Sequence, residues 1–126
     1  MRSKQQLLTA VYQKFNARDI DAVLPAMHPE VDWPNGMEGG RVHGHSGVRE
    51  YWERQWTIID PNVEPIRFVD DEAGRTVIDV HQVVRDLTGR ILVDQIVQHV
   101  YSIQNGLIER MDIRKPEIPS SEEIQK

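Results

Sequence analysis

Apolar side chains recur every three or four residues through much of the first half of the chain, which is the spacing of amphipathic helices. Residues 4–17 have leucine, valine and phenylalanine on this spacing, with lysine and glutamine between them. Asp19 is placed to cap a short second helix that ends by Pro29. A third helix is predicted over VREYWERQWTII, residues 48–59, with Ser46 as its cap.

The second half of the chain has the composition and the alternation of β-strands. Extended segments are predicted over residues 30–34, 65–71, 75–86, 90–104 and 107–114. Residues 35–47 contain five glycines and are expected to form a loop. Helices grouped ahead of antiparallel strands predict one α+β domain over residues 1–114, with three N-terminal helices packed on the sheet. Residues 115–126 are expected to form a polar tail.

Two turns give the expected strand register. The Asn105-Gly106 turn places Val100 opposite Met111, and the turn at Thr88-Gly89 places Asp79 opposite Gln98. One continuous face then carries Val77, Asp79, His81, Val83, Asp94, Ile96, Gln98, Val100, Met111 and Ile113. Because an acid and an imidazole stand together on a strand of β-branched residues, this face is predicted to line a ligand cavity.

The opposite face is also apolar, with Ile78, Val80, Val84, Val97 and Tyr101 among its residues. Three helices cannot cover both faces of the sheet, and a large uncovered apolar patch favours association. The sequence therefore predicts a homodimer through the outer sheet face.

Composition excludes several classes of function. The net charge of −5 and the pI near 5.5 argue against a nucleic-acid partner, which requires a basic surface. The chain has no cysteine, which excludes disulfides and thiolate chemistry. No apolar run reaches the roughly 18 residues of a membrane helix, and no signal peptide is recognisable. A cytoplasmic protein without a membrane partner is expected.

Three segments, FNARDIDAVLPAMHPEVDW, GHSGVREYW and HVYSIQNGLIERM, resemble the SnoaL-like, ketosteroid isomerase-like branch of the nuclear transport factor 2-like superfamily. The resemblance covers about residues 5–114. It implies a cone-shaped α+β fold in which three helices and a strongly curved sheet enclose a cavity. Members of the superfamily include isomerases, polyketide cyclases, dehydratases and epoxide hydrolases.

The residues of ketosteroid isomerase chemistry do not carry over. The resemblance puts Val11 where that enzyme has its helical tyrosine, with Tyr12 one place away. It puts Asn35 at the position of the catalytic base, and Gln98 at the second oxyanion donor, beside His99. That mechanism is therefore not expected, whereas Asp79 and His81 fall at positions that line the isomerase cavity.

The predicted site combines acid–base groups with an apolar wall. His81 is the candidate proton donor or acceptor, with Asp79 and Asp94 to orient or tune it. Amide hydrogen bonds to a ligand carbonyl are expected from Gln98 and Asn35. The wall is predicted to contain Trp33, Tyr51, Val83, Val100 and Met111. The competing interpretation is structural, with the titratable groups in a buried network or on a solvated face.

The leading hypothesis is an enzyme of isomerase, cyclase or dehydratase type that acts on a small, apolar, oxygenated molecule. One alternative is a ligand-binding or association module, and another is water activation by Asp79 or Asp94 with Asn35, as in epoxide hydrolysis. No organic cofactor is expected, because the glycines fit neither nucleotide-binding motif. His43 and His45 are interpreted as loop residues rather than metal ligands.

Overall fold

The computed structural model describes residues 3–115. The polar tail predicted over 115–126 therefore lies, apart from its first residue, outside the described residues. The helices are α1 (Lys4–Asn16), α2 (Ile20–Val23), the 3₁₀ turn η1 (Leu24–Ala26) and α3 (Gly44–Trp56). The strands are β1 (Met27–Pro34), β2 (Arg41–His43), β3 (Ile59–Asp70), β4 (Thr76–Asp86), β5 (Ile91–Gln104) and β6 (Leu107–Arg114).

The helix ends follow local hydrogen bonding. Helix α1 begins with a capping box in which the Ser3 hydroxyl accepts from the Gln6 amide and the Gln6 side chain accepts from the Ser3 amide. The predicted cap of α2 is confirmed, because the Asp19 carboxylate accepts from Ala22 N at 3.2 Å. Helix α3 begins at Gly44, four residues earlier than predicted, where the chain turns with a φ of +72°. Its N-cap residue is His43, so the prediction of Ser46 as the cap is wrong.

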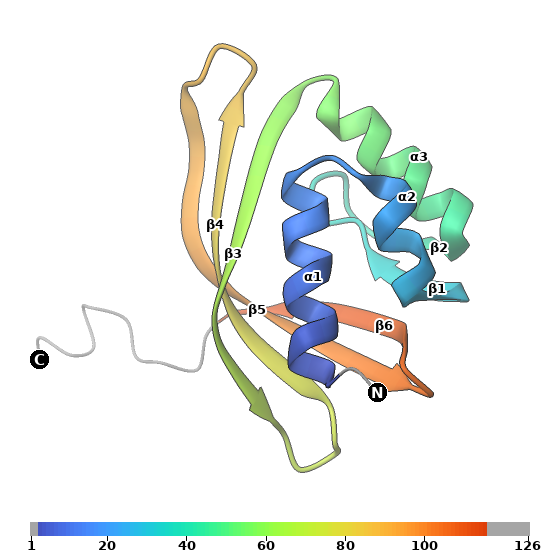
Figure 1. The fold of residues 1–126 in the computed structure, drawn as a ribbon. Coiled ribbons are helices and arrows are strands. Elements are labelled where there is room, and N and C mark those ends of the chain that lie inside the picture. Colours follow the sequence, from blue (N-terminus) through green and yellow to red (C-terminus); the bar gives the residue numbers. More distant parts are fainter. Residues whose placement is uncertain (1–2, 116–126) are drawn as a thin grey trace, which may run out of the picture.

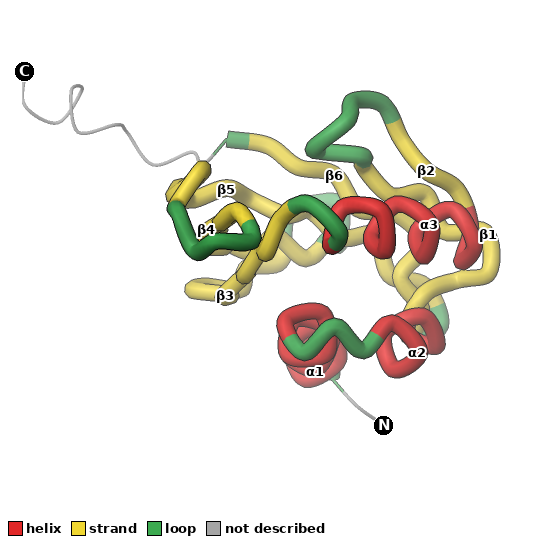
Figure 2. Tube along the Cα trace, turned by 90° about the horizontal axis from the view of Figure 1, so that it is seen from above, coloured by secondary structure: helices red, strands yellow, loops and turns green. Residues whose placement is uncertain are grey.

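The strands form one six-stranded sheet in the order β2-β1-β6-β5-β4-β3, in which β1 and β6 are parallel and the other neighbours antiparallel. The long strands bend, and all three helices lie on the concave side of the sheet (Figure 1). The view from above shows α1 and α3 facing the inside of the curved sheet (Figure 2). The α+β cone predicted from the sequence is confirmed.

The β4–β5 register is the predicted one, with Asp79 opposite Gln98. The β5–β6 register is not, because a bulge between Ser102 and Ile103 shifts the pairing by one residue. Met111 therefore lies opposite Tyr101, and the predicted pair of Met111 with Val100 is wrong.

The core lies between the helices and the concave face of the sheet. Leu8, Val48, Ile78, Val80 and Ile108 in this layer have no exposed surface. Burying each such side chain contributes about 1.5–3 kcal/mol, which fixes α1 and α3 against the strands. Among the described residues, no helix is long and apolar enough to cross a membrane.

Candidate functional site

A cavity of about 560 Å³ opens between the concave face of the sheet and helices α1 and α3. Its helix side is aromatic, with Phe15, Trp52 and Trp56 in mutual ring contact. Its sheet side includes Val84 and Val97. A mostly apolar hollow of this volume has the size and lining of a small-molecule site.

The most buried polar groups of the cavity form a hydrogen-bonded chain. Tyr12 comes from the buried side of α1, and His99 and Tyr101 are two residues apart on the concave face of β5. The Tyr101 hydroxyl donates to the Tyr12 hydroxyl at 2.9 Å, and the Tyr12 hydroxyl lies 2.8 Å from His99 Nδ1. The three rings are also in contact with one another.

Burial sets the protonation of this chain. It lowers the pKa of His99 to about 4 and raises the pKa of both tyrosines, so at neutral pH all three groups are uncharged. Because the Tyr12 hydroxyl accepts a hydrogen bond from Tyr101, its own hydrogen is left to donate to His99 Nδ1. A neutral imidazole that accepts at Nδ1 carries its hydrogen on Nε2.

The Nε2 atom of His99 is the ring nitrogen that the contact with Tyr12 leaves for a ligand. It has no hydrogen-bond partner among the described residues. Every fully enclosed side-chain nitrogen or oxygen of the described residues does have a partner, so Nε2 is not fully enclosed. Since His99 lines the cavity, Nε2–H is a fixed donor that a ligand oxygen can meet.

The loop between β1 and β2 closes one side of the cavity and is held to α3. Asn35 donates to Glu38 at 3.0 Å, and Glu38 also accepts from Arg54 at 2.7 and 2.8 Å and from Gln55 at 2.6 Å. The bonds from Arg54 lower the pKa of Glu38 to about 2. Met37 N donates to the Tyr51 hydroxyl at 3.1 Å. The loop is thus fixed to the helix by charged and polar contacts.

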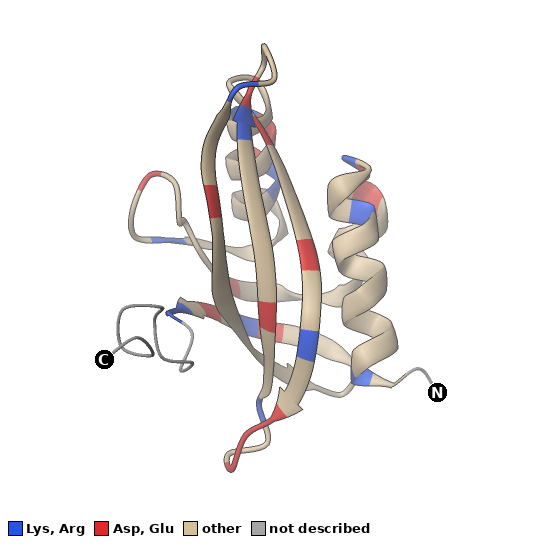
Figure 3. Ribbon diagram, turned by 90° about the vertical axis from the view of Figure 1, so that its left-hand side faces the viewer, with Lys and Arg blue, Asp and Glu red and all other residues tan. Residues whose placement is uncertain are grey.

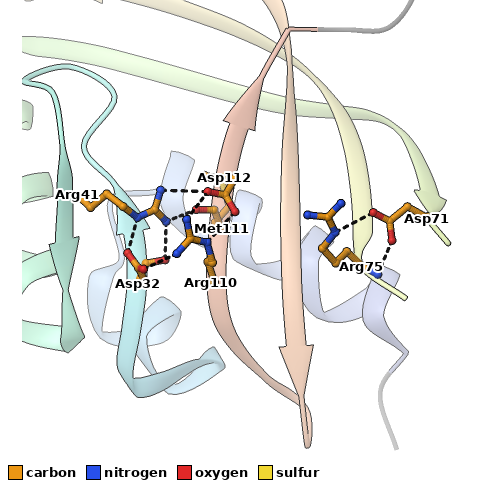
Figure 4. Close-up of polar contacts among 7 residues, drawn as sticks. All are labelled: Asp32, Arg41, Asp71, Arg75, Arg110, Met111 and Asp112. Carbon is orange, nitrogen blue, oxygen red and sulfur yellow. Dashed lines mark hydrogen bonds and ion pairs between the residues drawn. The ribbon is translucent and has the colours of Figure 1, made fainter. Parts of the chain in front are cut away.

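A cluster of two arginines and two aspartates lies where β2, β1 and β6 meet (Figure 4). Arg41 and Asp112 also line the cavity, and their side chains are 3.1 Å apart. Arg110 donates to Asp112 at 2.9 Å and pairs with Asp32 at 2.7 Å. Asp112 is the one carboxylate among the described lining residues, and the bonds from Arg110 lower its pKa. It is therefore a weak base.

A family model described as the SnoaL-like domain matches residues 8–111. The chain belongs to the SnoaL-like domain family. No curated protein matches the sequence.

Solved structures support the assignment of this SnoaL-like domain. It is similar to TerC co-crystallised with polyporic acid, with 27% identity over 97% of this chain and 98% of that chain and a TM-score of 0.76. It is also similar to a nuclear transport factor 2-like protein of unknown function from Burkholderia pseudomallei, with 28% identity, 92% of each chain covered and a TM-score of 0.77. A putative polyketide cyclase from Pseudomonas putida shares the fold at 18% identity, with 93% and 94% covered and a TM-score of 0.78.

Four of the residues predicted from the sequence lie in the wall of the SnoaL-like cavity. They are Trp33, Asn35, Tyr51 and Met111. Asn35 is engaged with Glu38, and the Tyr51 hydroxyl accepts from the loop backbone. Their part in ligand binding remains a prediction.

Six other predicted residues lie on the opposite, outer face of the sheet, and their predicted inward orientation is wrong. They are Asp79, His81, Val83, Asp94, Gln98 and Val100. The side chains of His81 and Asp94 are 2.7 Å apart but 43% and 55% exposed. Asp79 is buried and bonds to Gln98 at 2.9 Å and to Arg67 at 3.1 Å. The predicted water-activating pair of Asn35 with Asp79 or Asp94 therefore spans two sides of the sheet.

The bulge in the β5–β6 hairpin explains this error. Met111 does point inward, but the bulge brings it level with Tyr101, so the inward residues of β5 are the odd-numbered ones. Sequence analysis thus missed Tyr12, His99 and Tyr101. The available signal was that Tyr12 stands four residues after Leu8 on the buried side of the first helix.

No three histidine, aspartate or glutamate side chains in the described part of the chain are grouped as metal ligands would be. His45 Nε2 lies 2.9 Å from the Met27 carbonyl oxygen, and His43 is the N-cap residue of α3. His43 thus ends β2 and His45 lies in the first turn of α3, so the interpretation of both as loop residues is wrong.

Proposed function

We propose that this SnoaL-like domain binds a flat, largely apolar, oxygenated molecule and catalyses acid–base chemistry on it, of isomerase, cyclase or dehydratase type. The observation that carries the proposal is the chain from Tyr101 through Tyr12 to Nδ1 of His99 in the cavity wall, from which we assign the hydrogen to Nε2. These groups take the place of the His81 site predicted from the sequence. No organic cofactor is part of the proposal.

His99 acts as an electrophile. Its low pKa keeps the imidazole neutral at pH 7, so that it donates a hydrogen bond without giving up a proton. When a proton leaves the carbon beside a ligand carbonyl, negative charge develops on the carbonyl oxygen, and Nε2–H stabilises that charge. A fixed donor of this kind typically contributes 10²–10³ in rate.

The proton acceptor is assigned to water or to an ionised hydroxyl group of the ligand. Asp112 is the one carboxylate among the described lining residues, and two arginines hold it. This favours ligands whose own hydroxyl groups are acidic, such as phenols and hydroxyquinones.

The aromatic wall sets the ligand class. Trp33, Trp52 and Trp56 offer ring faces and edges to a planar molecule. TerC, which is 27% identical to this chain, was co-crystallised with polyporic acid. We therefore propose polyporic acid as the first ligand to test.

The experiment that tests catalysis is the exchange of the α-protons of 2-tetralone, a planar aromatic ketone, in D₂O by NMR. The wild type is expected to accelerate exchange and His99→Phe is not. Binding of 2-tetralone without accelerated exchange would instead make the protein a non-catalytic binding module. Absence of both would contradict the proposal.

We also propose that two copies associate through the outer sheet face. The residues predicted from the sequence to form that face, such as Ile78 and Val80, lie in the core instead, so this part of the prediction is wrong and the proposal now concerns the other face. Figure 3 shows this face, on which the strands carry acidic and basic positions separated by uncharged stretches. Val69 and Ile96 are 47% and 49% exposed there. A second copy would cover these side chains, which water otherwise solvates at a free-energy cost. A cytoplasmic location remains a prediction.

A further inference from the structure

Two glutamines stand on an exposed part of the concave face of the sheet, on β4 and, four residues before His99, on β5. Gln82 of β4 and Gln95 of β5 lie opposite each other and both line the cavity. The concave positions next to them on these strands are all valines: Val80, Val84, Val93 and Val97. An amide pair among aliphatic residues is therefore a second polar point in the cavity wall.

The two side chains keep hydrogen-bonding groups that their mutual bond does not use. Gln95 Nε2 donates to Gln82 Oε1 at 3.0 Å. This bond leaves the amide hydrogens of Gln82 as donors and the carbonyl oxygen of Gln95 as an acceptor, and no described residue bonds to either group. A donor next to an acceptor matches a hydroxyl group, which accepts and donates at once.

The spacing of the two polar points defines the shape of the ligand. Gln95 and His99 are four residues apart on β5, which corresponds to about 13 Å along an extended strand. Val97 lies between them on β5, and Phe15 and Trp56 line the helix side of the same cavity. The middle of the cavity therefore suits an aromatic or aliphatic body, with oxygen atoms at its ends.

We infer that Gln82 and Gln95 bind the far hydroxyl group of an elongated ligand whose near oxygen is at His99. The ligand class is a flat molecule about two aromatic rings long with an oxygen at each end. The assignment of the near end rests on the proposed function, whereas the far end rests on the glutamine pair alone.

The test compares 4,4′-dihydroxybiphenyl with 4-hydroxybiphenyl by isothermal titration calorimetry at pH 7. The wild type is expected to bind the dihydroxy compound about five- to tenfold more tightly, the effect of one or two hydrogen bonds. In the variant Gln82→Met/Gln95→Met this preference should fall to within about twofold. Gln13→Met, the same change on the exposed side of α1, should keep it.

The outcomes separate the two proposals. Equal binding of both compounds by the wild type, or a preference that survives the double substitution, overturns the glutamine assignment. His99→Phe should weaken both compounds alike and leave the preference. If His99→Phe changes neither affinity while the double variant loses the preference, the His99 assignment fails and the glutamine assignment stands. Failure of both compounds to bind the wild type contradicts both assignments.

If the double variant does not fold, judged by its thermal unfolding, Gln95→Met alone should reduce the preference.

Discussion

The hydroxyl of Tyr12 lies 2.8 Å from Nδ1 of His99, although the two residues are 87 positions apart in the chain. This contact joins the buried side of the first helix to the concave face of the sheet. It also decides which ring nitrogen of His99 carries the hydrogen, and so what a ligand meets in the cavity. The chemistry proposed for the protein follows from this one contact.

Removing the Tyr12 hydroxyl should disturb that choice of tautomer. In the wild type, the ¹⁵N shifts of His99 are expected to show hydrogen on Nε2 alone, because Nδ1 accepts from Tyr12. In Tyr12→Phe a mixture of both tautomers is expected, with affinity for phenolic ligands reduced about three- to tenfold through loss of one oriented donor. Tyr51→Phe is the control for the tautomer alone, since its hydroxyl bonds to the Met37 amide and not to His99. An unchanged Nε2–H signal in Tyr12→Phe would show that Tyr12 does not set the tautomer of His99.

Acid should destabilise the fold through His99. Its pKa is about 4 in the folded protein and near 6.5 when unfolded, so the unfolded state binds more protons between these values. The stabilisation is complete above pH 6.5 and is lost as the pH falls toward 4. Between pH 6.5 and 4.5 we expect the free energy of unfolding to decrease by about 2 kcal/mol.

Urea unfolding at several pH values measures this slope. His99→Gln should flatten it, because the titrating group is gone. The carboxylates with lowered pKa, such as Asp112, contribute mainly below their ordinary values near 4 and therefore outside this interval. A slope that persists in His99→Gln contradicts the assignment.

The loop over the cavity should open more readily once Glu38 loses its charge. Glu38→Gln weakens the bonds from Arg54, and ligand dissociation should accelerate several-fold. Stopped-flow release of bound polyporic acid gives the rate. Glu53→Gln removes a neighbouring charge that pairs with Arg49 on the same helix, and it should leave the rate unchanged.

Charge on the outer sheet face should block association. Sedimentation at micromolar concentration is expected to show a dimer for the wild type and a monomer for Ile96→Asp. Ile58→Asp, an equally drastic change at an isoleucine that is 59% exposed after α3, should remain dimeric. A monomeric wild type would remove the proposed interface.

The elements of the fold could be predicted because each has a local cause. Helical periodicity and Asp19 located the first helices, and Asn105-Gly106 located the last hairpin. The start of α3 was misplaced, because the sequence does not reveal that Gly44 adopts a positive φ against the Pro29 carbonyl. Such a contact joins segments far apart in the chain.

The site could be predicted only in part for a similar reason. Asn35 and Tyr51 were placed in the cavity through the family resemblance, Trp33 through its shared parity with Asn35, and Met111 through the last hairpin. Predicting His99 and Tyr101 as site residues required knowing which face of β5 meets the helices. Both faces are apolar, and one bulged residue in β6 decides between them. The pattern of apolar and polar residues does not predict that bulge.

The most direct test compares two histidines, one on each face of the sheet, by calorimetric titration with polyporic acid. His99→Phe should weaken binding at least tenfold, because the ligand loses a buried hydrogen-bond donor. His81→Phe, the same substitution on the outer face, should bind as the wild type does. Wild-type affinity in His99→Phe, or a loss confined to His81→Phe, would contradict the account.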